Sequence, residues 1–254
     1  MRWPWQRKKS VEILLIGTYH KTGTVWMQRV FNNLAKTLGT NFRDSDFGPE
    51  LTNPVPGYYL QDHSQFPQSL FKANHSGFRM IRDPRDVVIS GTHYHLKSHE
   101  SWLHEPRADM DGMSYQQALN ACATPVDQYL FEMKNVAYQT CQQMVADFDR
   151  LPEFATVRYE TWITDPDMKD FEATMQRLGF SGADLAAAKD VFFKFSLFGE
   201  RKHVDQHTRS GKVHQWRNVY TREMADSFIA LYGDALIQLG YEENHDWVTA
   251  LPDG

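Results

Sequence analysis

A short apolar run that leads into a lysine-containing turn constrains this chain more than any other feature. Residues 13–16 (ILLI) have the length and composition of a buried strand, and Gly17 follows them. Beyond the polar turn at 18–23, apolar residues recur at helical spacing from Met27 to Leu38, and Gly39 ends the pattern. The chain is therefore predicted to begin with a strand, a tight turn and a helix.

The same alternation of strands and helices continues along the chain. Further strands are predicted at 58–60, 78–81 and 154–157, and residues 40–57 are predicted to form a loop. Helices are predicted from Ser64 to Gly77, from Pro84 onward, over 125–149, from Pro166 to Gly179 and from Thr221 to Gly240. This order predicts an α/β fold in three layers, with a central parallel sheet flanked by helices and a P-loop-like phosphate-binding turn after the first strand. No repeat or linker divides the chain, so one domain is expected over 11–254, after a basic tail at 1–10.

Composition narrows the classes of partner. The 254 residues carry a net charge of -5, which argues against a nucleic-acid-binding surface but allows a local basic pocket. The two cysteines, Cys122 and Cys141, have no metal-ligand spacing, so a reducing compartment, the cytoplasm, is expected. No apolar run reaches the length of a transmembrane helix, although the basic, aromatic tail allows weak contact with a membrane surface. Nothing in the sequence bears on the oligomeric state.

The lysine turn lies where parallel sheets bind ligands, at the carboxyl end of a strand and the N-terminus of a helix. The backbone amides of Thr22, Gly23 and Thr24 can surround an anion, and Lys21 supplies a full positive charge. A phosphate is the expected ligand. The nucleoside-triphosphatase pattern G-x-x-x-x-G-K-[ST] does not match, because here the lysine precedes the glycine. Taken alone, the turn also fits an ordinary strand-to-helix connection.

Two further basic segments favour a phosphorylated ligand. Arg82 follows the strand at 78–81, and Ser90 comes two helical turns later, so that both side chains can reach one phosphate. A salt bridge for Arg82 and a solvated Ser90 are the alternatives. Near the other end of the chain, a polar loop carries Arg209, Ser210 and Gly211. Three such segments, far apart in sequence, indicate an anion-binding site more strongly than any one of them alone.

Together these segments resemble the cytosolic sulfotransferase family, whose donor is 3'-phosphoadenosine 5'-phosphosulfate. TYHKTGTVW resembles the TYPKSGTTW loop of that family, IRDPRDVVIS its strand-helix segment for the 3'-phosphate, and RSGKVHQWRNVYT its RKGxxGDWKNxFT segment. VRYETWITDP resembles its Tyr-Glu element, and the similarity extends from about residue 13 to 240. The resemblance implies donor-binding roles for Lys21, Thr22, Gly23, Thr24, Val25, Trp26, Arg82, Ser90, Tyr159, Arg209, Ser210 and Gly211. Within this set, Trp26 and Tyr159 are expected beside the adenine.

The chain also departs from the family pattern. His20 replaces a proline, Val25 replaces a threonine and so removes a hydroxyl from the loop, and Ser210 replaces a lysine near the 3'-phosphate. His214 and Gln215 replace a Gly-Asp pair. These changes make the affinity for the donor less predictable than its identity.

Two histidines compete for the role of the general base that the family places after its second strand. A crossover between parallel strands needs at least about ten residues. His75 leaves too few before the strand at 78–81, whereas His63 leaves enough and stays near the end of the preceding strand. We therefore predict His63 as the base, although Gln61 stands where the family often has a lysine. The histidines between 93 and 104 lack a matching pair of carboxylates, so no metal site is predicted.

The sequence thus predicts a metal-independent sulfotransferase with Lys21 and His63 as catalytic residues. It would move a sulfuryl group to a hydroxyl or amine of a small-molecule, carbohydrate or lipid acceptor, by an in-line transfer that resembles phosphoryl transfer. Two alternatives stay open: a P-loop nucleotide kinase or other phosphotransferase, and a catalytically silent nucleotide-binding module.

Overall fold

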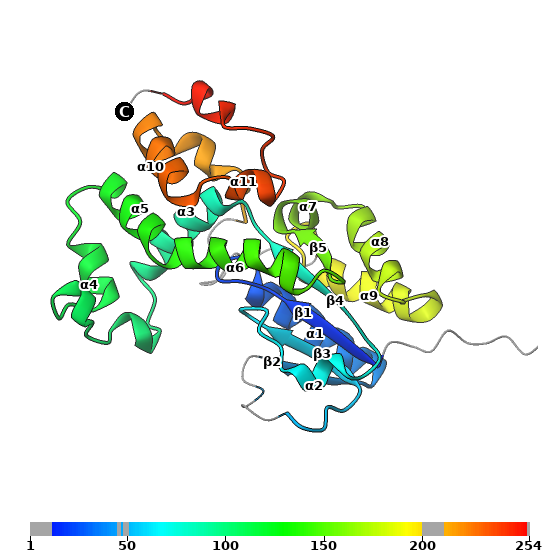
Figure 1. The fold of residues 1–254 in the computed structure, drawn as a ribbon. Coiled ribbons are helices and arrows are strands. Elements are labelled where there is room, and N and C mark those ends of the chain that lie inside the picture. Colours follow the sequence, from blue (N-terminus) through cyan, green and yellow to red (C-terminus); the bar gives the residue numbers. More distant parts are fainter. Residues whose placement is uncertain (1–11, 45–46, 48–50, 200–210, 253–254) are drawn as a thin grey trace, which may run out of the picture. The chain divides into compact units, whose positions relative to one another are not determined.

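A parallel sheet of five strands forms the centre of the fold in the residues that the computed structural model describes, which are 12–44, 47, 51–199 and 211–252 (Figure 1). The strand order is β2-β3-β1-β4-β5, and every neighbouring pair is parallel. The strands are β1 (Ile13–Gly17), β2 (Asn41–Asp44), β3 (Gly57–Gln61), β4 (His75–Ile81) and β5 (Ala155–Arg158). The predicted fold class, α/β with a parallel sheet flanked by helices, is confirmed.

Helices make up most of the remaining regular structure. The α-helices are α1 (Thr24–Leu38), α2 (Gln68–Phe71), α3 (Pro84–His95), α4 (Tyr115–Asn120), α5 (Pro125–Lys134), α6 (Val136–Arg150), α7 (Tyr159–Thr164), α8 (Lys169–Arg177), α9 (Gly182–Phe195), α10 (Arg222–Tyr232) and α11 (Ala235–Gln238). Short 3-10 helices are η1 (Ser101–Leu103), η2 (Ala108–Met110), η3 (Gln215–Asn218) and η4 (Asp246–Ala250). None of the helices in the described ranges is both long and apolar enough to cross a membrane.

The described residues group into two compact units. The first contains the residues up to Ile81 and those from Leu151 to Gly211, and it holds the whole sheet. The second contains Arg82 to Arg150 and the residues from Lys212 onward. Its described helices and 3-10 helices include α3 and η3. The single domain over 11–254 stays a prediction, and the tail at 1–10 lies outside the described residues.

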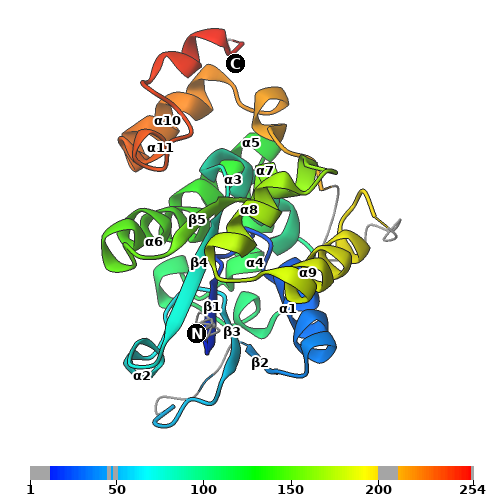
Figure 2. The same cartoon turned by 90° about the vertical axis from the view of Figure 1, so that its right-hand side faces the viewer.

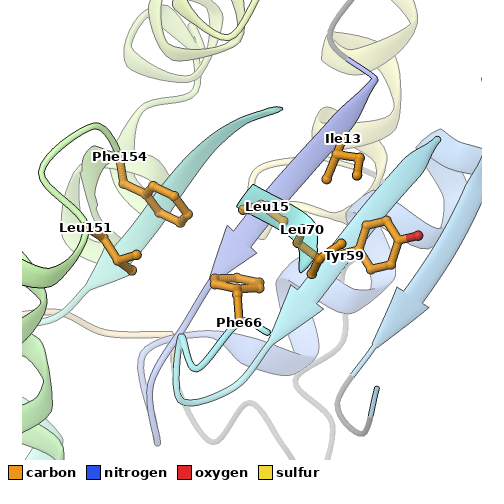
Figure 3. Packing of buried hydrophobic residues seen from close by; sticks show 7 residues of the cluster. All are labelled: Ile13, Leu15, Tyr59, Phe66, Leu70, Leu151 and Phe154. Atoms are coloured by element: carbon orange, nitrogen blue, oxygen red, sulfur yellow. The ribbon is translucent and has the colours of Figure 1, made fainter. Parts of the chain in front are cut away.

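The central strand β1 is buried along its whole length, which explains its unbroken apolar sequence. Ile13 and Leu15 belong to a core cluster with Tyr59 of β3, and Figure 3 shows how these side chains gather on one side of the sheet. Leu70 of α2 and Phe154 cover the same cluster. Because side chains alternate along a strand, the intervening residues of β1 point to the opposite face of the sheet.

Helix α1 covers that opposite face. The ring of Phe31 lies 6.1 Å from that of Tyr58 on β3 and 5.6 Å from that of Phe78 on β4. Helix α9 packs alongside α1, as Figure 2 shows. Gly39 ends α1 in a left-handed conformation, with φ 67°, and its N–H donates to carbonyls in the last turn. The helix end predicted at Gly39 is confirmed.

The helix predicted from Ser64 to Gly77 is wrong. Ser64 is buried in a left-handed conformation, and its hydroxyl donates to the Thr18 carbonyl at 3.2 Å, so it caps no helix. Only the short α2 forms, and Gly77 lies within β4. A Cβ at Gly77 would lie 2.7 Å from the ring of Phe154, so the glycine permits close packing on the strand rather than a helix end.

Several other elements also differ from their predictions. The helix predicted over 125–149 is two helices, because Asn135 between α5 and α6 has a non-helical backbone (φ -119°, ψ -110°). Strand β2 lies in the predicted loop at 40–57, and helix α9 had no counterpart in the prediction. Helix α8 begins at Lys169 rather than at Pro166, and Gly233 divides the predicted last helix into α10 and α11.

Candidate functional site

The lysine turn connects the carboxyl end of β1 to the first turn of α1. Thr22 donates its backbone N–H to the Tyr19 carbonyl at 3.1 Å, which closes a tight turn with Lys21 in a left-handed conformation (φ 62°). Gly23 is the N-cap of α1, and among the described residues no side chain caps the helix. The first amides of a helix have no acceptor within the helix itself. The amide groups at the start of α1 are therefore the ones suited to an anion.

The hydroxyls of the two threonines form hydrogen bonds within the turn and with the end of β1. The Thr22 hydroxyl accepts from the Tyr19 N–H at 2.8 Å and donates to the Tyr19 carbonyl at 3.0 Å, and Thr22 is fully buried. Both the amide and the hydroxyl of Thr22 are thus bonded to Tyr19 within the turn, and its contact with a ligand stays a prediction. The Thr24 hydroxyl lies 2.9 Å from that of Thr18, which joins the end of the strand to the start of the helix.

Gly23 is where a β-carbon would not fit. Its φ of 113° is a conformation that side-chain-bearing residues rarely adopt. A Cβ built there would lie 3.1 Å from the Met80 sulfur and 3.2 Å from the Tyr159 ring. The turn is thus pressed against β4 and against the first residue of α7, which brings Tyr159 next to the lysine turn.

Trp26 lies on the first turn of α1 within an aromatic cluster. Its ring centroid is 6.0 Å from that of Tyr159, in an edge-to-face arrangement, and 5.2 Å from that of Phe192 on α9. Trp26 is 7% exposed, and within the described chain its indole N–H has no hydrogen-bond partner. A buried donor without an acceptor costs about 1–3 kcal/mol, so a ligand that accepts this hydrogen bond would recover that cost.

The loop after β3 is hydrogen-bonded to Thr18, at the start of the lysine turn. The Thr18 N–H donates to the Gln61 carbonyl at 3.0 Å, while the Thr18 carbonyl accepts from Ser64. The Gln61 side-chain oxygen accepts from the N–H groups of His63 at 2.7 Å and of Gln65 at 2.8 Å. Gln61 therefore shapes the loop that carries His63. The prediction missed Gln61 and Ser64 in these roles, since nothing local in the sequence marks them.

The register of the sheet separates the two candidate bases. Gly17 pairs with Gln61, so the half-buried His63 follows β3 at the edge where the lysine turn follows β1. His75 pairs with Ile13 at the opposite end of the strands, where its ring contacts the Ala73 carbonyl and Phe71. His63 thus has the predicted position at the carboxyl end of a parallel strand, and its role as the base stays a prediction.

The predicted phosphate contacts Arg82 and Ser90 belong to the second unit. Arg82 is buried, and its Nη2 lies 3.9 Å from Oδ2 of Asp86. Ser90 is half-buried on α3, whose N-cap Asp83 is followed by Pro84 as predicted. The convergence of these residues with Lys21 stays a prediction.

The third predicted segment is only partly described. Arg209 and Ser210 lie outside the described residues, and Gly211 has a left-handed backbone with φ 61°. Trp216 follows on η3, and its N–H donates to Asp86. In the ranges that the structure describes, no group of three or more histidine, cysteine or acidic residues is placed to hold a metal ion.

Comparison with known proteins assigns the fold. Mouse sulfotransferase SULT7A1, solved with PAP, superposes with a TM-score of 0.57 at 14% identity, over 90% of this chain and 84% of that one. The chain has a sulfotransferase fold. Retinol dehydratase also matches, in a complex with retinol and PAP (TM-score 0.55, 13% identity, 89% of this chain and 81% of that one). Its complex with androsterone and inactive cofactor PAP gives a TM-score of 0.51 at 15% identity, over 88% and 80% of the two chains. No protein-family model and no curated protein matches.

Proposed function

We propose that this protein is a sulfotransferase that moves a sulfuryl group from 3'-phosphoadenosine 5'-phosphosulfate to an acceptor hydroxyl or amine. The observation that carries the proposal is the uncapped start of α1, with Lys21 and Gly23 in left-handed conformations at the end of the central strand. Trp26 on the same helical turn supports it independently, because its buried indole N–H has no hydrogen-bond partner among the residues that the structure describes. The sulfotransferase fold and its PAP-bound structural neighbours agree with this ligand.

The donor would be held by its two anionic ends. The 5'-phosphosulfate lies against the Lys21 ammonium and the backbone amides of Gly23 and Thr24. This position is beside Val25 at the start of α1, where the helix dipole favours negative charge. The 3'-phosphate is assigned to Arg82, Ser90, Arg209, Ser210 and Gly211. Trp26 and Tyr159 form the adenine contact, and Thr22 supports the turn from within.

In the reaction, His63 accepts the proton of the acceptor group at an imidazole nitrogen as the acceptor oxygen or nitrogen attacks sulfur. The bond between sulfur and the bridging phosphate oxygen breaks, and the Lys21 ammonium stabilises the charge that develops on this oxygen. Because a sulfuryl group carries less negative charge than a phosphoryl group, the lysine and the helix amides suffice without a metal ion. A positioned general base contributes about 10²- to 10⁴-fold to such a step.

Acceptors to test first are small alcohols with an apolar skeleton. Retinol and androsterone, which occupy the retinol dehydratase structures, are of this kind. Carbohydrate and lipid hydroxyls form the second group of a screen.

The test is the transfer of labelled sulfate from the donor to a panel of these acceptors, in the wild type and in two variants. Lys21→Ala should nearly abolish transfer while the protein stays folded. Lys36→Ala removes an exposed lysine from the last turn of the same helix and should leave transfer unchanged. Transfer by Lys21→Ala at the wild-type rate would refute the role of the lysine. Tighter binding of ATP with magnesium than of adenosine 3',5'-bisphosphate would select a kinase instead.

A further inference from the structure

Ser64, the residue after the candidate base, packs directly against the last residue of the central strand. A Cβ built on Gly17 would lie 2.5 Å from the Oγ of Ser64 and 3.2 Å from its Cβ. Gly17 ends β1 and pairs with Gln61 at the end of β3. Because Gly17 has no side chain, the loop that follows β3 can cross the end of β1 in close contact with it.

Hydrogen bonds hold Ser64 in this position. Its backbone N–H donates to the Gln61 carbonyl at 3.2 Å, and its hydroxyl donates to the Thr18 carbonyl at 3.2 Å. Ser64 is fully buried and has a left-handed backbone with φ 55°. Such a conformation is unfavourable for a residue with a side chain and persists only where the surrounding contacts determine it. The contacts with Gly17, Thr18 and Gln61 therefore fix the course of the loop.

The same contacts connect the candidate base to the start of α1. His63 directly precedes Ser64, so a displacement of Ser64 also displaces the backbone of His63. On the other side, the Thr18 hydroxyl lies 2.9 Å from that of Thr24 in the first turn of α1. All of these residues belong to the first unit. A series of short contacts thus runs from the loop that carries His63 to the helix start that we assign to the donor.

We propose that Gly17 and Ser64 are a positioning pair that sets the distance between the His63 imidazole and the phosphosulfate of the donor. This inference rests on the proposed function and deepens it, because it concerns the alignment of the reacting groups rather than the binding of the donor. The pair acts through the backbone of His63 and takes no part in proton or sulfuryl transfer. In-line transfer depends on this alignment, and a displacement of about 1 Å can lower the rate by about 10²-fold.

Two substitutions and their combination test the pair. Gly17→Ala places a methyl group 2.5 Å from the Ser64 Oγ, so Ser64 must move by about 1 Å to restore an ordinary contact. Ser64→Gly removes both atoms that this methyl group meets, and a glycine adopts the left-handed backbone without strain. The next atom, the Arg79 Cβ at 3.5 Å, is in ordinary contact. The double variant therefore has room for the methyl group.

The expected rates are not additive. With an acceptor from the screen, kcat should fall by about 10²-fold in Gly17→Ala through displacement of His63. In Ser64→Gly it should fall by about tenfold, because the loop loses a hydrogen bond. The double variant should have the rate of Ser64→Gly rather than the product of the two losses, since the clash requires the serine side chain.

A second measurement needs no acceptor. The NMR signal of the His63 imidazole, assigned with His63→Gln, should shift when adenosine 3',5'-bisphosphate binds, because the phosphate charge acts on a nearby ring. Gly17→Ala and Ser64→Gly should lose much of this shift while their calorimetric affinity for the bisphosphate stays at the wild-type value. If Gly17→Ala does not fold, Ser64→Gly alone decides the outcome.

Ser76→Ala is the matched control. Ser76 lies on β4 of the same unit, and its hydroxyl also donates to a backbone carbonyl, that of Leu178 at 3.4 Å. It pairs with Leu14, away from the end of β1, so the variant should keep both the rate and the His63 shift. A full His63 shift in Ser64→Gly would overturn the positioning role, and so would a loss of bisphosphate affinity in Gly17→Ala, which would show that the lysine turn moves instead. A wild-type protein that does not bind the bisphosphate, or whose His63 signal ignores it, would instead refute the proposed function.

Discussion

The substitution Gly23→Ala tests whether the lysine turn needs a residue without a side chain. Gly23 has φ 113°, and an added methyl group would lie 3.1 Å from the Met80 sulfur and 3.2 Å from the Tyr159 ring. The methionine can move aside at little cost, whereas the tyrosine ring is packed edge-to-face against Trp26. The alanine therefore meets both a strained backbone and a crowded neighbour.

The expected cost follows from these two effects. A non-glycine residue in a sparsely populated backbone region costs about 1–3 kcal/mol, and we expect about 2 kcal/mol here. For a chain of this size each kcal/mol lowers the melting temperature by about 2–4 °C, so a decrease of about 4–8 °C is predicted. The displaced turn should also weaken binding of adenosine 3',5'-bisphosphate by at least about tenfold, since Lys21 and the helix amides shift with it.

Gly39→Ala is the control for backbone strain at the other end of the same helix. Gly39 is also left-handed, with φ 67°, but an added Cβ would meet nothing within 4 Å. A loss of about 1 kcal/mol and normal nucleotide affinity are expected for this variant. Thermal unfolding followed by circular dichroism, together with calorimetry, measures both quantities. If Gly23→Ala is no less stable than Gly39→Ala and binds the nucleotide normally, the lysine turn does not need a glycine at position 23.

Four further predictions concern the candidate site and the sheet beneath it. His63→Ala should lower kcat by about 10²- to 10⁴-fold with unchanged bisphosphate affinity, while His75→Ala should have no effect; the reverse result in steady-state kinetics would exchange the two roles. Gln61→Ala should reduce transfer by about tenfold, because the N–H groups of His63 and Gln65 lose their acceptor, and Gln61→Glu should restore it; equal rates in all three proteins would exclude this role. Burial raises the pKa of Tyr58 to about 12, with a smaller contribution from Asp184, so the unfolded state loses its proton first as the pH rises above 10. The free energy of unfolding should therefore fall more steeply between pH 10 and 12 in the wild type than in Tyr58→Phe, and parallel denaturation profiles would contradict this assignment. Chelators should leave the rate of sulfate transfer unchanged, and inhibition reversed by added metal would show that Lys21 and the helix amides do not suffice.

Elements with a strong local signal could be predicted from the sequence. The apolar run at 13–16, the capping pair Asp83 and Pro84 and the helix end at Gly39 each depend on a few adjacent residues, and each appears in the structure as predicted. The lysine turn could be placed for the same reason, since a strand, a glycine-containing turn and a helix succeed one another within 30 residues.

Elements that depend on distant contacts could not be predicted. Ser64 looks like a helix cap in sequence, but its hydroxyl bonds to Thr18, 46 residues earlier in the chain. Gly77 looks like a helix end, but it makes room for Phe154 on β4. The hydrogen bond from the Trp216 N–H to Asp86 is likewise invisible in either segment, because the two residues lie 130 positions apart. In each case a tertiary contact replaced the local preference.

A crystal structure of this protein with adenosine 3',5'-bisphosphate tests the role of the lysine turn most directly. We expect the 5'-phosphate at the amides of Gly23 and Thr24, within hydrogen-bond distance of the Lys21 ammonium, with the adenine beside Trp26 and Tyr159. A nucleotide bound away from the start of α1, or bound there with Lys21 turned away from the phosphate, would contradict this role.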